Sequence, residues 1–122
     1  MKPNTWMSVG ALSGAITVAL GAFGAHALKD SVTPEDLAIW ETGVHYQGLH
    51  ALALVLYGLA QQVKPKSCIA GPCFLAGSVI FSGTLYAMTL GAPRWFGAIT
   101  PIGGVLLIVG WIALAVSRWR AG

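Results

Sequence analysis

Residues 6–28 read WMSVGALSGAITVALGAFGAHAL and contain no Lys, Arg, Asp or Glu. About 20 mostly apolar residues are enough for a helix to cross the roughly 30 Å hydrocarbon layer of a bilayer. Inside that layer the backbone finds no water, so a helix that satisfies its own hydrogen bonds is favoured. This stretch therefore predicts a membrane-spanning helix, and it sets the fold class of the chain.

Three further stretches have the same character: 44–61, 68–90 and 97–119. Hydrophobic residues make up 56% of the 122-residue chain and charged residues 9%, with a mean hydropathy of +0.72. That composition excludes a disordered chain, a basic nucleic-acid-binding domain and an ordinary cytosolic enzyme. We expect an all-α polytopic membrane protein, a four-transmembrane-helix bundle with short loops that forms a single domain over 1–122. We therefore expect the protein to be in contact with the lipid bilayer and not to bind nucleic acid.

The first stretch also has features of a secretory signal peptide. Lys2 precedes an apolar run, and Ala25-His26-Ala27 resembles a cleavage site of the A-x-A type. However, the run is longer than the core of about 7–15 residues that signal peptides contain. We therefore expect a retained first helix.

The second span is preceded by a helix start over 34–43. Thr33 is a suitable N-cap, and a proline and two acidic residues follow it. A continuous helix to the end of the second span would be roughly 40 Å long, more than a bilayer requires. Either 34–43 is an interfacial segment bent at Gly43 or Gly48, or the helix projects into the periplasm. Trp40 suits an interfacial anchor.

Basic residues near the helix ends predict the orientation. With four spans, the side of both termini carries Lys2, Lys64, Lys66, Arg118 and Arg120, and the other side carries Lys29 and Arg94. Because cytoplasmic loops hold the excess of Lys and Arg, we expect both termini in the cytoplasm, with the chain in a cell inner membrane. Cys68 and Cys73 would then face a reducing compartment and remain thiols.

Small residues form stripes along three predicted helices, and close backbone approach at such residues drives helix association in lipid. The helix-packing candidates are Gly10, Gly14, Gly21 and Gly24 in the first helix, Ser78 and Ser82 in the third, and Gly103 and Gly110 in the fourth. We expect them to pack within one bundle or between protomers. A substrate groove or sliding surface is the alternative.

Ionisable groups approach the bilayer interior in the stretch 40–50, WETGVHYQGLH. The candidate polar cluster comprises His26, Glu41, His45, Tyr46, Gln47 and His50. Glu41 and His45 share one helix face, whereas His45 and His50 are about 140° apart and cannot chelate one ion together. A group of Glu41, His45 and His26 across two helices is geometrically possible.

Ionisable residues at this depth are costly, so they indicate either function or internal hydrogen bonding. Three interpretations remain open: bonds to neighbouring helices, a small-molecule or lipid-headgroup pocket, and metal, haem or proton-transfer chemistry. For the first, the expected partners are Ser78, Ser82, Thr84 and Thr100. The sequence has no Gly-rich phosphate loop, nucleophile motif or paired interior carboxylates, and two cysteines alone make no metal site. We therefore predict no catalytic residue, metal or cofactor.

Several blocks together resemble a known family. They are GALSG (10–14), LGAFGAHALK (20–29), WETGVHYQ (40–47), HALA (50–53), FSGTLY (81–86), ITPIGG (99–104) and GW (110–111). They are similar to the small membrane proteins described as domain of unknown function 423, whose eukaryotic relatives are called transmembrane protein 256. The resemblance covers nearly the whole chain and implies an inner-membrane protein. That family carries no established activity, so the resemblance implies no catalytic role.

Within the matching blocks, the resemblance directs attention to the polar or special residues His26, His45, Tyr46, Gln47, His50, Ser82, Tyr86, Thr100 and Pro101. The leading functional hypothesis is a non-enzymatic accessory or assembly subunit that binds other membrane-protein subunits or a second copy of itself. The alternative is a small-molecule, lipid or proton-linked binding or transport protein that uses the histidine cluster. A membrane enzyme has the least support in the sequence.

Overall fold

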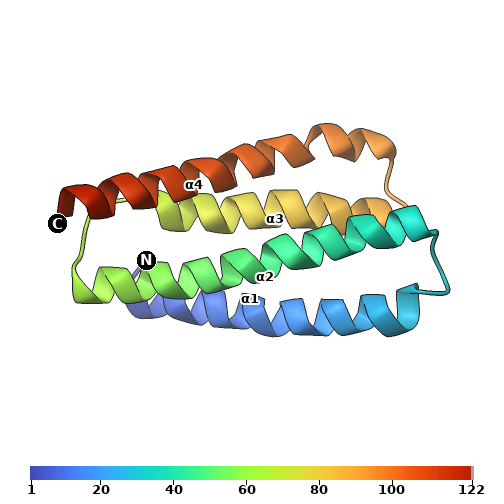
Figure 1. Cartoon of the computed structure of the whole chain (residues 1–122), viewed down its shortest axis with the longest axis horizontal. Helices are drawn as coiled ribbons and strands as arrows, with labels where there is room; N and C mark the ends of the chain where they lie inside the picture. The colour runs from blue at the N-terminus through green and yellow to red at the C-terminus, as the bar shows by residue number, and fades with distance from the viewer. Residues whose placement is uncertain (122) are drawn as a thin grey trace.

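The computed structural model describes residues 1–121, which are helical apart from short connections (Figure 1). The elements are α1 (Pro3–Phe23), a π-helical turn η1 (Gly24–Leu28), α2 (Pro34–Val63), α3 (Ala70–Thr89), a 3-10 turn η2 (Arg94–Ala98) and α4 (Thr100–Ala121). The all-α class predicted from the sequence is confirmed.

The four long helices are antiparallel to their neighbours in sequence (Figure 1). α2 packs on both α1 and α3, and α4 packs mainly on α3. The start of α1, the 64–69 connection and the end of α4 lie together, at what we call the terminal end. The 29–33 and 90–99 connections lie at the opposite end, which we call the loop end.

Charge is divided unevenly between these two ends. The terminal end has five basic residues. All four acidic residues of the sequence lie within 30–41, in the half of the molecule that includes the loop end. With Lys29 and Arg94 also at the loop end, the formal charges are +5 and −2, which give the net +3. One ion pair joins elements at the loop end, where Arg94 Nη2 lies 2.7 Å from Asp36 Oδ1.

Three helical segments are long and apolar enough to cross a membrane: Pro3–Leu28, Ala70–Thr89 and Arg94–Arg120. α2, with 30 residues, is not among them. Its hydropathy is lowered by polar side chains, yet His50 and Gln61 are buried and Gln47 is partly buried. The sequence predicted four spans of similar character, and this holds for three. Which polar side chains of α2 are exposed therefore depends on which of them the adjacent helices bury.

α2 begins at Pro34, ten residues before the predicted span, and it continues through Gly43 and Gly48 to Val63. The Asp36 backbone N–H donates to Thr33 Oγ1 at 3.1 Å, so the predicted N-cap is confirmed. Neither Gly43 nor Gly48 interrupts the helix, as an interfacial segment would require.

These two glycines instead allow close packing. A Cβ atom on Gly43 would lie 2.7 Å from the Tyr86 ring, and one on Gly48 would lie 3.0 Å from the Thr17 methyl group. Such distances are shorter than van der Waals contact, so larger residues would push α3 and α1 away from α2. Gly43 and Gly48, at which a bend was predicted, are therefore points of close contact between helices.

Trp40 lies inside the helix packing, so the prediction of an interfacial anchor is wrong. Its side chain is 2% exposed, and its Nε1 donates to the Leu20 carbonyl oxygen at 3.0 Å. Its ring centroid lies 5.7 Å from that of Phe23 and 4.6 Å from that of Tyr86. Gly24 leaves room for it, because a Cβ there would lie 2.7 Å from the indole. Trp40 thus joins α1, α2 and α3.

The predicted glycine stripe of α1 faces α2. At Gly10 an added Cβ would lie 2.8 Å from the Ala51 carbonyl oxygen, so backbone meets backbone there. Cβ atoms at Gly14 and Gly21 would make ordinary contacts with α2 side chains, at 4.0 Å and 3.5 Å. The tight positions of this stripe are therefore Gly10 and Gly24, at its two ends.

Among the glycines between α3 and α4, Gly103 has the least room for a side chain. A Cβ on Gly103 would lie 2.5 Å from the Phe81 backbone nitrogen and 2.9 Å from the Gly77 carbonyl oxygen. One on Gly110 would lie 2.9 Å from the Phe74 ring. Backbone cannot rotate aside as a side chain can, so Gly103 is the position least able to accept a side chain.

We predict that Gly103→Ala lowers the free energy of unfolding by about 1–3 kcal/mol, the usual cost of overpacking. Gly83→Ala is the matched control, because Gly83 is on the outside of α3 and a Cβ there would meet nothing within 4 Å. The control should be neutral, or stabilising by up to about 1 kcal/mol. Denaturant titration of the purified chain in mild detergent measures both. Equal effects would contradict the assignment.

Candidate functional site

The structure divides the predicted polar cluster into outward and inward residues. His26, Glu41 and His45 are exposed, and Tyr46 is 39% exposed. Gln47 is partly buried, and His50 is 2% exposed. The six side chains therefore differ in exposure, although the Tyr46 ring centroid lies 5.7 Å from that of His45 and 6.3 Å from that of His50.

The possible group of Glu41, His45 and His26 is not formed as a metal site. Within residues 1–121, no three His, Cys, Asp or Glu side chains come together in a way that could hold a metal ion. Glu41 and His45 follow one face of α2, and His26 belongs to the π-helical turn after α1. Glu41 and His45 are thus two exposed side chains on one face of α2, which we call the outward pair.

His50 uses both of its ring nitrogens in helix contacts. Its Nε2 accepts a hydrogen bond from Trp111 Nε1 of α4 at 2.9 Å. Its Nδ1 lies 2.7 Å from the Tyr46 carbonyl oxygen, which can only accept. The ring is therefore in its neutral form with the proton on Nδ1. A histidine held in this way joins α2 to α4 and has no free nitrogen for a ligand.

Aromatic rings surround this histidine. The His50 ring centroid lies 5.7 Å from that of Phe74 and 5.8 Å from that of Trp111, and these two rings are 4.8 Å apart. The hydrogen bond between imidazole and indole is therefore shielded by apolar contacts, which strengthens it relative to a bond in water.

Gln47 joins three helices. Its Nε2 donates to the Ser13 carbonyl oxygen of α1 at 3.3 Å, and its Oε1 accepts from the Tyr86 hydroxyl of α3 at 2.6 Å. Nearby, Ser82 Oγ donates to the Gly43 carbonyl oxygen at 2.7 Å, a second link between α3 and α2. These bonds satisfy polar groups within the chain where lipid could not.

Beside Gln47, a cavity of about 290 Å³ opens between α1, α2 and α3. Its lining is mostly apolar, with Ile16, Leu54 and Val79 among its residues. The buried Ser78 Oγ on its wall has no hydrogen-bond partner among the described residues. Ser78 thus lies at a groove instead of in the tight packing predicted for it.

A second polar network fixes the 64–69 connection at the terminal end. Gln61 Nε2 donates to the Lys66 carbonyl oxygen at 2.7 Å, and the Lys66 backbone N–H donates to Gln61 Oε1 at 2.7 Å. Arg118 of α4 donates to the Lys64 carbonyl oxygen at 2.8 Å and to Gln61 Oε1 at 3.2 Å. The Tyr57 hydroxyl accepts from Gln61 Nε2 at 3.0 Å and donates to the Cys68 carbonyl oxygen at 3.0 Å. The connection is therefore bound to both α2 and α4.

Several residues of these networks were not among the sequence candidates, notably Trp111, Gln61 and Arg118. The signal for Trp111 was an indole N–H in the middle of an apolar helix, because a buried donor needs an acceptor. The predicted Ser and Thr partners of the histidines are wrong: Thr84 and Thr100 bond to each other, with 2.6 Å between their Oγ1 atoms.

The helices and their internal polar networks define an all-helical membrane protein, and comparison with known proteins gives its family. The model of the family "Protein of unknown function (DUF423)" matches residues 20–104. The chain belongs to this family, which confirms the resemblance found in the sequence.

Curated relatives match over most of their length. A UPF0382 membrane protein of Staphylococcus epidermidis is 43% identical over 118 residues, which are 96% of this chain and 97% of the relative. The UPF0382 membrane protein YwdK of Bacillus subtilis is 41% identical, with 93% and 95% covered. The UPF0382 inner membrane protein YgdD of Escherichia coli is 40% identical, with 90% and 86% covered. No solved structure matches the chain.

We predict that Trp111→Phe lowers the free energy of unfolding by about 1–3 kcal/mol, because it removes the donor to His50 Nε2 and leaves a buried acceptor unsatisfied. Trp95→Phe is the matched control, because Trp95 is an exposed residue of η2. Thermal unfolding of the purified variants in detergent, followed by circular dichroism, measures both. An unchanged midpoint for Trp111→Phe would show that this bond adds no stability.

Proposed function

We propose that the chain crosses a cell inner membrane four times, with both termini in the cytoplasm. The formal charge of +5 at the terminal end and −2 at the loop end supports this orientation, because Lys and Arg accumulate on the cytoplasmic side. The E. coli relative is an inner membrane protein by name.

Two hydrogen bonds support α2 as the fourth span. Thr89 Oγ1 donates to the Asp36 carbonyl oxygen at the loop end, and the Tyr57 hydroxyl donates to the Cys68 carbonyl oxygen at the terminal end. Between them α2 lies alongside the 20 residues of α3, which are about 30 Å long. A bilayer that contains α3 would then contain this part of α2.

A thiol-labelling experiment tests the orientation. In a chain whose Cys68 and Cys73 are replaced by alanine, we expect an impermeant maleimide to label Asp30→Cys in intact spheroplasts but not Ser67→Cys. Both positions are exposed in connections, so access depends on the side of the membrane. Inverted vesicles should reverse the pattern, and the opposite result would overturn the proposed orientation.

We infer further that the protein is a non-enzymatic accessory subunit whose α2 binds another membrane protein. The observation that carries this inference is the outward pair Glu41 and His45, exposed on one face of α2. His45 is nine residues beyond Asp36, which places it about 14 Å along the helix from the level where α3 ends. In the proposed topology it therefore faces the hydrocarbon layer.

A polar side chain at this depth is costly when it faces lipid and is stabilised by a protein partner. A partner helix that offers a hydrogen-bonding side chain at His45 would remove that cost. The alternative of a binding or transport site built on the histidines has less support, because both ring nitrogens of His50 are bonded within the chain. The inward polar residues stabilise the helix packing and include no acid–base pair.

Photocrosslinking tests the partner. Benzoylphenylalanine at His45 should give a discrete protein adduct in native membranes, whereas the same group at Ile108 should crosslink only lipid. Ile108 is 60% exposed on α4, one turn from the Trp111 that bonds to His50, so its depth is similar. Adducts that are equal at both positions, or lipid alone at His45, would contradict the proposal. An adduct between two copies of the chain would show that the face with His45 binds a second copy, and it would overturn the proposed accessory role in favour of a homo-oligomer.

A further inference from the structure

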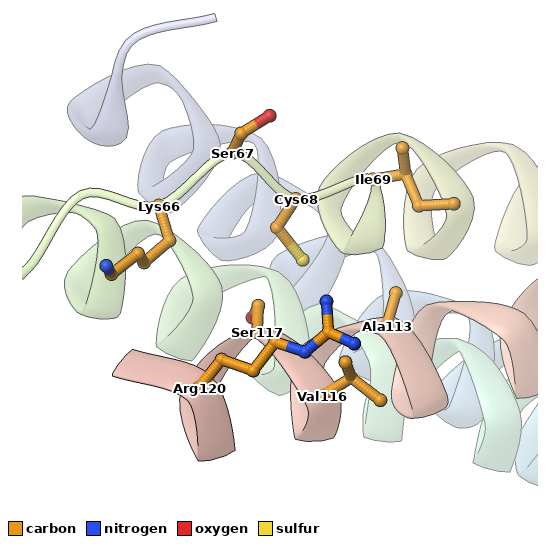
Figure 2. Close-up of a pocket in the computed structure, with 8 residues that line it drawn as sticks. All are labelled: Lys66, Ser67, Cys68, Ile69, Ala113, Val116, Ser117 and Arg120. Atoms are coloured by element: carbon orange, nitrogen blue, oxygen red, sulfur yellow. The ribbon is translucent and has the colours of Figure 1, made fainter. Parts of the chain in front are cut away.

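A pocket of about 510 Å³ lies at the terminal end, between the 64–69 connection and the last turns of α4 (Figure 2). Lys66 borders it from the connection and Arg120 from α4, with Ser117 one turn earlier. In Figure 2 the Arg120 guanidinium and the Cys68 thiol point toward each other, whereas the Lys66 ammonium points away from Arg120. Both cationic residues line the pocket, and only the Arg120 guanidinium is directed into it.

Two basic residues border the pocket, and no Asp or Glu lies near them in the sequence. All four Asp and Glu residues lie within 30–41, at the other end of the helices. Within residues 1–121, neither the Lys66 ammonium nor the Arg120 guanidinium has a hydrogen bond or an ion pair. Arg118 differs, because its guanidinium is bonded to the connection. Lys66 and Arg120 are therefore available to an external anion.

Beside Ser67, Cys68 and Ser117, the lining includes three apolar residues. Ile69, Ala113 and Val116 continue the pocket toward the middle of the helices, and Ile69 and Val116 are exposed. The pocket lies where α3 begins and α4 ends, which is the level of the lipid headgroups if α3 and α4 span the bilayer. Cations at headgroup level above an apolar wall are complementary to a molecule with an anionic head and an acyl chain.

We infer that this pocket binds an anionic phospholipid, with its phosphate on the Arg120 guanidinium, the flexible Lys66 side chain turned toward it, and an acyl chain along Ile69 and Val116. The planar guanidinium of arginine can hold two phosphate oxygens at once, and lysine adds a mobile point charge. Basic pockets between membrane helices recognise such headgroups in this way. The inference does not rest on the proposed accessory role, since it needs no protein partner.

Native mass spectrometry of the full chain, released from nanodiscs of equal phosphatidylglycerol and phosphatidylcholine, tests the site. We expect the wild type to retain phosphatidylglycerol preferentially. Lys66→Gln and Arg120→Gln should each reduce that preference about fivefold, which corresponds to about 1 kcal/mol for one basic side chain. Both residues are exposed, so these substitutions leave the helix packing intact.

Lys29→Gln is the matched control, because it removes the same charge from an exposed position at the loop end. It should leave the preference unchanged, and Arg120→Lys should lose less than Arg120→Gln. An excess of inorganic phosphate should not displace the lipid, because free phosphate lacks the acyl contacts. An equal loss in Lys29→Gln, no loss in either pocket variant, or displacement by phosphate would overturn the site.

Discussion

The polar side chains of α2 need partners within the protein, and this requirement organises the four helices. Gln47 joins α2 to α1 and α3, His50 joins it to α4, and Gln61 joins it to the 64–69 connection. In the proposed topology the bilayer supplies no alternative partners, so each bond fixes both the rotation of a helix and its height beside its neighbour. The glycine contacts at Gly10 and Gly103 then become possible, since the backbones are already aligned.

The fold class and the helix count follow from local sequence, because apolar length and capping are local properties. Thr33 was predicted as an N-cap on that basis and is one. The membrane character of α2 was harder to judge, since hydropathy treats an inward polar residue and an outward one alike. Trp40 was placed at an interface because tryptophan is enriched there, whereas its burial depends on the rings of Phe23 and Tyr86 that pack on it. The π-helical turn over 24–28 had no signal of its own in the sequence.

The candidate site also shows that local sequence does not determine which helices and side chains contact each other. Helical periodicity separated His45 from His50 correctly, and the structure has them exposed and buried, respectively. Periodicity could not name the partner of His50, because the relative height of two helices is set by packing along their whole length. Trp111 is 61 positions away in sequence, and nothing local connects it with the histidine. Of the predicted partners, Ser82, Thr84 and Thr100 bond to other groups, and Ser78 Oγ has no partner among the described residues.

The packing of each helix chiefly on its neighbours in sequence has a consequence for the synthesis of the protein. A segment as polar as α2 partitions poorly from the translocation channel into lipid by itself. α1 is already made when α2 emerges, and its glycine face and Ser13 are complementary to α2 and Gln47. In the proposed topology the two helices can therefore enter the membrane as a hairpin, before Tyr86 and Trp111 are made and complete the remaining bonds. The order of the chain is also a workable order of assembly.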